Sequence, residues 1–319
     1  MSEPTISLKS SSSLRTLPFL ERLRYWMKLL RMSIAGARNK PDFTDLQASY
    51  LQHDECARQY LGRPLTACKV VEIGYGARPN RLIWFRGQGV DITGIDLDQP
   101  ILFGRPLEFL RVYRKNGWER ALKSVGRWLI GERHLRRALL DELSRQQGKR
   151  FPLPAASLEV GDAADAGYWA RHREAEYIFS EDVFEHIPAE ALPRLVAMIA
   201  GSMHPKGIAV IKPMIYTGIC GGHHLEWFPH THNQPTQRRT GPWEHLRQNR
   251  YPADTYLNRL TRADYRKLIA QNFDILEETV AVPGMGSQFM TPEIRDELRA
   301  YSDEELYSNS VRFVLRPRS

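Results

Sequence analysis

The sequence predicts an α/β protein built on a doubly wound, mostly parallel sheet. Residues 69–98 give the first indication, because an apolar run at Val70-Val71 leads into a glycine turn, a helical pattern and a second apolar run at 90–95. Further apolar runs, separated by helical patterns or turns, lie at 158–160, 175–180 and 208–211. Short apolar strands that alternate with helices are typical of a parallel sheet covered by helices on both faces.

Length and composition place the chain among ordinary globular proteins. Its 319 residues suffice for one large α/β domain with additions, and its composition is 42% hydrophobic and 26% charged. No apolar run approaches the roughly 18–20 residues that span a bilayer, and the N-terminus lacks the apolar core and cleavage site of a signal peptide. The three cysteines, Cys56, Cys68 and Cys220, are too scattered for a disulfide framework, so we expect reduced thiols and a cytoplasmic location.

The net charge of +8 comes from two segments. Residues 1–40 hold 8 Lys or Arg and 2 Asp or Glu, and residues 101–150 hold 13 and 5. Subtracting both segments from the totals of 45 and 37 leaves 24 basic and 30 acidic residues in the rest of the chain. Positive charge concentrated in this way indicates contact with an anionic surface, whether nucleic acid, lipid or substrate, or else helix faces that are simply solvated.

We expect residues 1–65 to form a helical N-terminal extension of the main domain. From Pro18 onward apolar residues recur at helical spacing, with basic residues off the stripe. The stripe consists of Phe19, Leu23, Trp26 and Leu30. Such a helix either lies on an anionic membrane surface or packs on its own domain. Peripheral contact with the inner membrane face, through residues 18–32 and 100–150, is therefore one expectation, and Asp45–Leu61 is predicted as a second helix.

Two segments interrupt the alternation of strands and helices within the main domain, residues 66–319. Residues 100–152 separate the second and third predicted strands, where one short helix is usual, and their pattern predicts two or three inserted helices. Residues 216–258 lack periodicity, and a long irregular loop in a compact domain is usually functional. This loop holds five of the ten histidines: His223, His224, His230, His232 and His245. We expect the insertion to form a cap or docking surface and the loop to line the functional site.

The glycine turn after the first strand indicates an adenosine-containing cofactor. Glu72, Gly74 and Gly76 are followed by Arg78, so neither a GxGxxG nor a GxxxxGK[ST] phosphate-binding motif is present. An acid directly before the turn would repel a pyrophosphate but suits a cationic ligand, and S-adenosylmethionine carries an ammonium and a sulfonium without a phosphate. Asp96 ends the second strand, at about the 20-residue spacing expected of an acid that binds ribose hydroxyls.

Residues 69–98 resemble motif I of the class I S-adenosylmethionine-dependent methyltransferases, E/D-x-G-x-G-x-G, with Arg78 where the third glycine is common. The resemblance extends to the tips of the third and fourth strands, at Asp162-Ala163 and Ser180–Ile187, in the family's order. It implies S-adenosylmethionine as the cofactor and a Rossmann-like sheet of seven strands, with a final hairpin in which one strand is antiparallel. The two hairpin strands are predicted at 273–280 and 310–315.

The resemblance also implies a role for each strand tip. The glycines let the backbone approach the methionine part of the cofactor, Asp96 accepts hydrogen bonds from both ribose hydroxyls, and Asp162 with Ala163 contacts the adenine edge. The implied cofactor-binding residues are Glu72, Gly74, Tyr75, Gly76, Asp96, Leu97, Asp162, Ala163 and Glu181. An N-cap or a surface acid would account for any one tip, but it does not account for the ordered set.

Beyond the fifth strand, the runs HHLEWFPH, GPWEHLR and YLNRLTRADYRKLI resemble a subgroup of bacterial methyltransferases that modify surface polysaccharides and other small molecules. An oxygen acceptor needs a base near neutral pH, for which histidine is suited. His223 is the first candidate, because Gly221-Gly222 gives it freedom to move, and His224 and His186 are the others. The candidate acceptor contacts are Trp243, Asn258 and Arg259. The spacing of the histidines fits no standard zinc signature, so no metal site is predicted.

These patterns together predict a methyltransferase that acts at an oxygen of a small molecule or glycoconjugate. One alternative is methylation of a lipid or quinone at the inner membrane face, which the basic segments favour. Another is a non-catalytic scaffold with the same fold. A nucleic-acid methyltransferase is disfavoured, because Ser180–Phe184 stands where an NPPY-type tetrad would lie and no RNA-binding module is recognisable.

Overall fold

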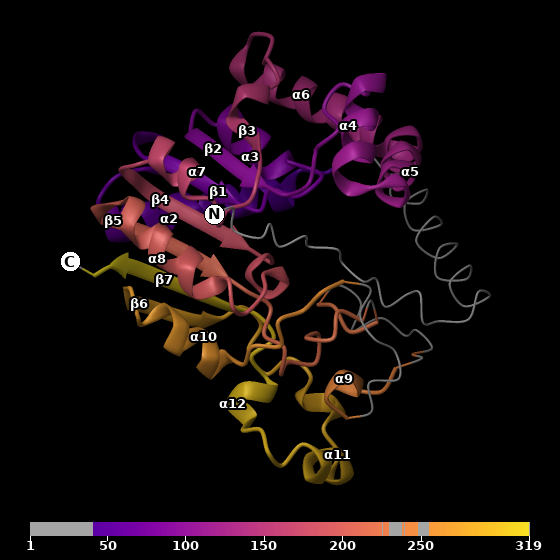
Figure 1. The fold of residues 1–319 in the computed structure, drawn as a ribbon, viewed down its shortest axis with the longest axis vertical. Helices are drawn as coiled ribbons and strands as arrows, with labels where there is room; N and C mark the ends of the chain where they lie inside the picture. The colour runs from indigo at the N-terminus through magenta and orange to yellow at the C-terminus, as the bar shows by residue number, and fades with distance from the viewer. Residues whose placement is uncertain (1–40, 225, 230–237, 239, 248–254, 319) are drawn as a thin grey trace, which may run out of the picture.

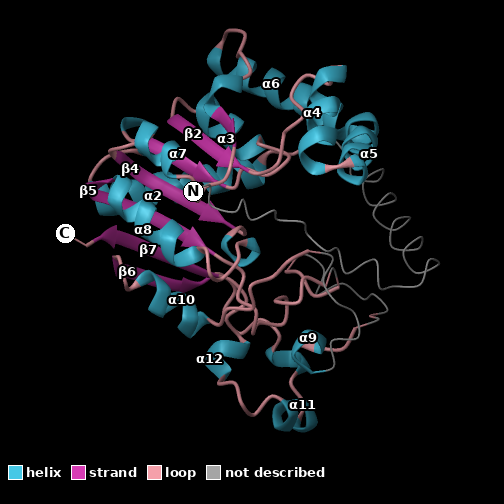
Figure 2. Cartoon of the chain, viewed as in Figure 1, coloured by secondary structure: helices cyan, strands magenta, loops and turns pink. Residues whose placement is uncertain are grey.

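Seven strands form one sheet in the order β3-β2-β1-β4-β5-β7-β6 (Figures 1 and 2). The computed structural model describes residues 41–224, 226–229, 238, 240–247 and 255–318. The strands are β1 (Lys69–Ile73), β2 (Asp91–Asp96), β3 (Leu158–Val160), β4 (Ala175–Glu181), β5 (Met203–Lys212), β6 (Phe273–Val280) and β7 (Val311–Pro317). β1 to β5 run parallel, whereas β7 is antiparallel to both β5 and β6. The predicted seven-stranded, mostly parallel sheet with a final antiparallel hairpin is confirmed.

Helices cover both faces of the sheet, as Figure 2 shows. α2 (Thr44–Leu61) and α3 (Asn80–Gly87) pack on one face, and α7 (Ala166–Arg171), α8 (Leu192–Ser202) and α10 (Arg262–Ile269) pack on the other. Because successive side chains of a strand point to opposite faces, Val70 joins the core under α2 and α3, whereas Val71 joins the other core. Burial on both faces explains why the strands read as continuous apolar runs.

β5 is longer than the predicted apolar run at 208–211. It begins at Met203, and its pairing with β4 shifts register near its start. The predicted turn Pro205-Lys206-Gly207 lies within the strand. Glycine is needed at its end, because a Cβ at Gly207 would lie only 2.9 Å from the carbonyl oxygen of His204. The irregularity is confined to this end, so the carboxyl ends of β4 and β5 remain paired.

The insertion consists of α4 (Pro106–Asn116), α5 (Trp118–Arg127) and α6 (Arg133–Gln147), with a π-helical turn, Trp128–Glu132, between the last two helices. α6 packs against α3, where a Cβ on Gly87 would lie 2.4 Å from the side chain of Leu143. α4 and α5 extend beyond the β3 edge of the sheet, on the side of the strands' carboxyl ends (Figure 1). The insertion is helical, as predicted, and the helix predicted at 18–32 lies outside the described residues.

The described parts of residues 216–247 pack with residues 282–309 around a third hydrophobic core. Its buried members are Ile219, Cys220, Trp227, Trp243, Met285, Ile294, Leu298 and Leu306. Three short helices belong to this unit, which lies beyond the β6 edge in Figure 1: α9 (Glu244–Arg247), α11 (Pro292–Glu297) and α12 (Asp303–Leu306). The segment that lacks periodicity in the sequence is therefore held by a core of its own.

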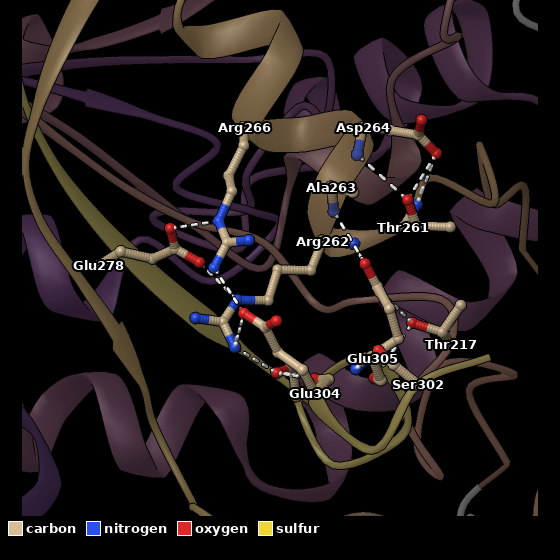
Figure 3. A network of polar contacts seen from close by, with 11 residues as sticks. Thr217, Thr261, Arg262, Ala263, Asp264, Arg266, Glu278, Ser302, Glu304 and Glu305 are labelled. Atoms are coloured by element: carbon tan, nitrogen blue, oxygen red, sulfur yellow. Dashed lines mark hydrogen bonds and ion pairs between the residues drawn. The ribbon is translucent and has the colours of Figure 1, made fainter.

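A polar network joins this unit to α10 and β6 (Figure 3). Glu305 accepts hydrogen bonds at 2.9 Å from the first two backbone N–H groups of α10 and from the hydroxyl of Thr217. A carboxylate at a helix N-terminus is favourable, because the free N–H groups there carry partial positive charge. Arg262 and Arg266 of α10 both pair with Glu278 of β6. The loop that follows β5 is thereby fixed to α10 close to the strand ends.

Candidate functional site

The turn after β1 brings two glycines to the carboxyl end of the sheet. Gly74 and Gly76 have φ angles of 84° and 69°, in the left-handed region that favours glycine. A Cβ on Gly74 would lie 2.1 Å from Val183 Cγ2, just beyond β4, whereas a Cβ on Gly76 would find its nearest neighbour 3.9 Å away. Gly74 is therefore required for the close approach of two turns, and Gly76 only for its backbone conformation.

Gly74→Ala is expected to destabilise the fold by about 2–4 kcal/mol, because overpacking costs about 1–3 kcal/mol and the left-handed conformation about 1 kcal/mol more. Gly76→Ala is the matched control and should lose only about 1 kcal/mol. Urea unfolding of both variants measures the difference. Adding Val183→Ala to Gly74→Ala should restore part of the loss, and equal losses in the two single variants would contradict the steric account.

Asp96 ends β2, and two backbone N–H groups hold its carboxylate. Oδ2 accepts a hydrogen bond from Gly76 at 2.7 Å, and Oδ1 accepts one from Asp98 at 2.6 Å. Burial raises the pKa of this carboxyl, and the two N–H donors oppose the rise. Each carboxylate oxygen accepts more than one hydrogen bond, so both retain capacity for hydroxyl groups of a ligand. Leu97, which is 43% exposed, adds an apolar surface next to them.

Asp162 and Ala163 follow β3, beside the end of β2. The N–H of Gly161 donates to the carbonyl of Asp96 at 2.9 Å, which joins the two strand tips. Asp162 is exposed, and its Oδ1 accepts a hydrogen bond from the Ala164 N–H at 2.8 Å. The tips of β1, β2 and β3 therefore form one continuous row, with the Asp162 carboxylate accessible at its end.

Three of the predicted cofactor residues lie beneath the glycine turn. The ring of Tyr75 is buried, and its hydroxyl donates to a backbone carbonyl of β3 at 2.7 Å. Glu72 is 1% exposed and pairs with Arg81 at 2.7 Å. Arg81 also pairs with Glu181 at the end of β4. These side chains support the turn from below, which leaves its backbone for contact with a ligand.

Arg81 is the central cation of this buried network. Glu181 lies 3.3 Å from the Nζ of Lys212 and 3.4 Å from the Nε2 of His53. Burial alone would raise the pKa of Glu181, but the nearby imidazole of His53 and the charges of Arg81 and Lys212 outweigh it and lower the pKa. For Glu72 burial prevails and the pKa is raised despite Arg81. One oxygen of Glu72 has no hydrogen-bond partner, so its charge depends on Arg81.

Glu185, His186 and His223 meet where β4 and β5 end. Glu185 and His186 lie in a 3-10 turn directly after β4, and His223 follows β5. One possible ligand atom from each residue lies within 4.8 Å of the others, and the two imidazole rings are 5.0 Å apart, edge to face. Asn258 holds this turn, because its side-chain amide donates to two carbonyls in and just after it, at 2.7 and 3.0 Å. The candidate acceptor contact Asn258 is thus a residue that positions the cluster.

The pKa values of this cluster bear on the predicted base. Burial, followed by the neighbouring histidines, lowers the pKa of His223 to about 3. Burial raises the pKa of Glu185 to about 8, and the charge of Asp182 adds to the rise. His223 is therefore a neutral, weakly basic imidazole whose Nε2 has no hydrogen-bond partner. Burial thus brings the pKa of the Glu185 carboxyl close to neutral pH, as a general base requires.

The other predicted residues lie in different surroundings. The Nε2 of His224 is buried without a partner, burial lowers the pKa of this histidine, and its ring is 6.2 Å from that of His245. Trp243 is fully buried in the third core, so the structure does not support an acceptor contact by its ring. Arg259 is exposed, with its guanidinium 5.8 Å from the centre of the Tyr216 ring. Outside the described residues lie His230 and His232.

Two important residues of the site are absent from the predicted set. Glu185 directly precedes His186, so an acid adjacent to a candidate base was the available signal. Arg81 carries no such signal, because its partners Glu72 and Glu181 come together only when β1 and β4 pair. Pairing between strands that are distant in sequence is what the local pattern does not specify.

The sheet order and the final hairpin are those of the Rossmann-like fold of class I methyltransferases. The chain is also similar to solved structures of S-adenosylmethionine-dependent methyltransferases. A TehB-like enzyme from Corynebacterium glutamicum is 13% identical, with a TM-score of 0.40, over 94% of this chain and 97% of that one. The magnesium protoporphyrin IX methyltransferase from Synechocystis, with bound SAH, is 13% identical, with a TM-score of 0.41, over 88% and 89%. The CcbJ methyltransferase from Streptomyces caelestis is 12% identical, with a TM-score of 0.41, over 82% and 88%.

Neither a protein-family model nor a curated protein matches the chain. The strand order and pairing define the fold, and the strand tips are the residues that bear on function.

Proposed function

We propose that the chain transfers a methyl group from S-adenosylmethionine to an oxygen of a small molecule or glycoconjugate. The observation that carries the proposal is the row of strand tips, with Gly74 and Gly76 after β1, Asp96 after β2 and Asp162 after β3. The strand order reverses between β1 and β4, and ligands of open α/β sheets bind at such a point. When bound, the cofactor supplies a methyl group on a positively charged sulfur.

The residues at the row of tips fit this cofactor. At Gly76 the nearest atom to a Cβ would be 3.9 Å away, so the turn presents bare backbone that a ligand can approach closely. Asp96 offers both carboxylate oxygens to a pair of neighbouring hydroxyls, and Leu97 offers apolar cover for a flat base. The exposed carboxylate of Asp162 is available to an exocyclic amino group. No phosphate-binding motif competes with this assignment.

We place the acceptor beside Glu185, His186 and His223. They follow β4 and β5, on the opposite side of β1 from Asp96, so adenosine over β2 and β3 would leave the methyl group facing them. An oxygen acceptor gives up a proton, and this cluster holds the groups that can take it or stabilise the oxyanion. Arg259 is exposed nearby and suits an anionic group on the acceptor.

A transfer assay tests the proposal. The full chain is incubated with S-adenosylmethionine carrying an isotopically labelled methyl group and with nucleotide sugars, oligosaccharides and phenols, and the products are identified by mass spectrometry. We expect labelled methyl ethers. Binding of the cofactor without transfer to any of these, or to a lipid, would favour the scaffold alternative.

A lipid or quinone acceptor at a membrane surface is the second candidate, and the insertion favours it. In α4, α5 and the π-helical turn after them, six large hydrophobic side chains are at least 40% exposed: Leu107, Leu110, Tyr113, Trp118, Leu122 and Leu129. They share α4, α5 and the following turn with the basic residues of the insertion, a combination that binds anionic membrane surfaces. Among the described residues, no helix is both long and apolar enough to cross a bilayer.

Leu122→Glu combined with Leu129→Glu is expected to lower binding to vesicles of phosphatidylserine and phosphatidylcholine at least about 10-fold, because burying each leucine contributes about 1.5–3 kcal/mol. Leu51→Glu on α2, where the leucine is 54% exposed, is the control and should leave flotation unchanged. Vesicle flotation of the full chain measures both. Absence of flotation in the parent chain would remove the membrane candidate.

A further inference from the structure

The carboxylate of Glu185 is the starting observation. The residue is 3% exposed, and neither carboxylate oxygen has a hydrogen-bond partner. The backbone N–H groups of Glu185 and Met214 lie near enough to favour its charge, but they do not reach hydrogen-bond geometry. Buried polar groups are almost always partnered, and a buried charge without a partner costs several kcal/mol or more. Such a group requires either a proton or a cation.

One nitrogen of His186 and one of His223 lie within 4.8 Å of the carboxylate and of each other. The Nδ1 of His186 lies 2.9 Å from the carbonyl oxygen of Tyr256. Because a carbonyl only accepts, Nδ1 carries the hydrogen and Nε2 keeps a free lone pair. The Nε2 of His223 is buried and has no partner. A histidine whose other nitrogen donates to a backbone carbonyl is the usual arrangement of a metal ligand, because that hydrogen bond fixes the tautomer and the ring.

We propose that Glu185, His186 and His223 bind a divalent first-row transition-metal ion. Two imidazole nitrogens and one carboxylate oxygen suit Mn²⁺, Fe²⁺, Co²⁺ or Zn²⁺, whereas Mg²⁺ and Ca²⁺ prefer oxygen ligands. Three protein ligands leave coordination positions open to a further molecule.

The distances are compatible with one ion. Bonds to imidazole nitrogen and carboxylate oxygen are about 2.0–2.2 Å long, so the ligand atoms of a tetrahedral ion lie about 3.4 Å apart. The ligand atoms here are within 4.8 Å of one another, which small side-chain rotations can close. Asn258 fixes the turn that carries two of the ligands, and the left-handed backbone of His223, with φ of 55°, fixes the third.

The location gives the ion a role, and this part rests on the proposed function. The cluster lies at the ends of β4 and β5, where we place the acceptor. A metal ion there would bind the acceptor oxygen as a Lewis acid and lower the pKa of its hydroxyl. The proton of the acceptor would then pass to water, because the three ligands of the ion are no longer available to accept it.

Metal binding is measured on the full chain, stripped with a chelator and dialysed, without cofactor or acceptor. Mn²⁺, Co²⁺, Zn²⁺ and Mg²⁺ are titrated separately by calorimetry, and visible absorption of the Co²⁺ form reports nitrogen ligands. The variants are Glu185→Gln, His223→Asn and, as a matched control, His224→Asn, whose imidazole is adjacent and also has an unpartnered Nε2. If Glu185→Gln fails to fold, His223→Asn carries the test.

We expect one transition-metal ion per chain, bound at least about 100-fold more weakly by Glu185→Gln and His223→Asn, because loss of an outer-shell partner alone costs about 10–100-fold. His224→Asn should bind like the parent chain. No stoichiometric binding, binding of Mg²⁺ alone, or loss in His224→Asn with retention in His223→Asn would overturn the assignment. Because S-adenosylmethionine is titrated separately, failure of the metal site and failure of the proposed function give different results.

Discussion

Asp96→Asn is expected to weaken the binding of S-adenosylmethionine at least about 10-fold, and Asp96→Ala at least about 100-fold, because each charge-assisted hydrogen bond contributes about 1.5–3 kcal/mol. Asparagine keeps one acceptor oxygen and the size of the side chain, but it loses the charge. Alanine also removes the partner of the Gly76 N–H, at 2.7 Å in the parent chain, and so loosens the glycine turn. Calorimetric titration of the full chain measures all three affinities.

Asp91→Asn is the matched control for this prediction. Asp91 begins the strand that Asp96 ends, and its side chain is 73% exposed and pairs only with Arg86 at the surface among the described residues. Its replacement should change neither the dissociation constant of the cofactor nor the equilibrium constant of unfolding by more than a factor of about 2, as expected of an exposed ion pair. Equal losses in Asp91→Asn and Asp96→Asn would show that the effect is general and not a property of the β2 tip.

Arg81→Met is expected to destabilise the fold more than Gly74→Ala, with a loss of about 3–5 kcal/mol in the free energy of unfolding. It leaves Glu72 and Glu181 buried without their shared cation, at exposures of 1% and 9% for the two side chains. Arg63→Met is the control, because Arg63 is 41% exposed in its pair with Glu176, and an exposed pair contributes about 1 kcal/mol or less. Urea unfolding measures both variants.

The same variant has a defined pH dependence. Burial already raises the pKa of Glu72 above its ordinary value of 4.5, and removal of Arg81 raises it further. An acid whose pKa is higher in the folded state favours folding below its unfolded pKa and disfavours it as pH rises through the folded pKa. The destabilisation by Arg81→Met should therefore grow from pH 4.5 toward neutral pH as Glu72 ionises without its cation, in addition to a part from Glu181 that is present throughout this range. Adding Glu72→Gln should flatten the profile, and a loss that is independent of pH would contradict the role of Arg81.

The strand tips could be predicted from the sequence because their signals are local. A buried parallel strand is a continuous apolar run, and the residues that follow it lie at one edge of the sheet, so Gly76, Asp96 and Asp162 could be placed together before any contact was known. The structure adds the hydrogen bond between Gly76 and Asp96, which joins residues 20 positions apart. The strand boundaries differ mainly at β5, where Gly207 lets a predicted turn remain within the strand.

The acceptor side was harder to predict because its contacts are non-local. Trp243 has the residue type of a ligand contact, yet it is buried in a core formed with residues 282–309, which no local periodicity indicates. Asn258 also has the type of a ligand contact, but it is used to hold the turn after β4. Glu185 acquires its importance only when β4 and β5 pair and bring His223 to it. These residues depend on tertiary packing, which overrides what a short stretch indicates.

The most direct test of the central claim is a calorimetric titration of the full chain with S-adenosylmethionine, S-adenosylhomocysteine and NAD⁺. The row of tips without a phosphate-binding motif predicts one micromolar site per chain for each of the two sulfur compounds and no binding of NAD⁺. Preference for NAD⁺, or no binding of either sulfur compound, would contradict the account.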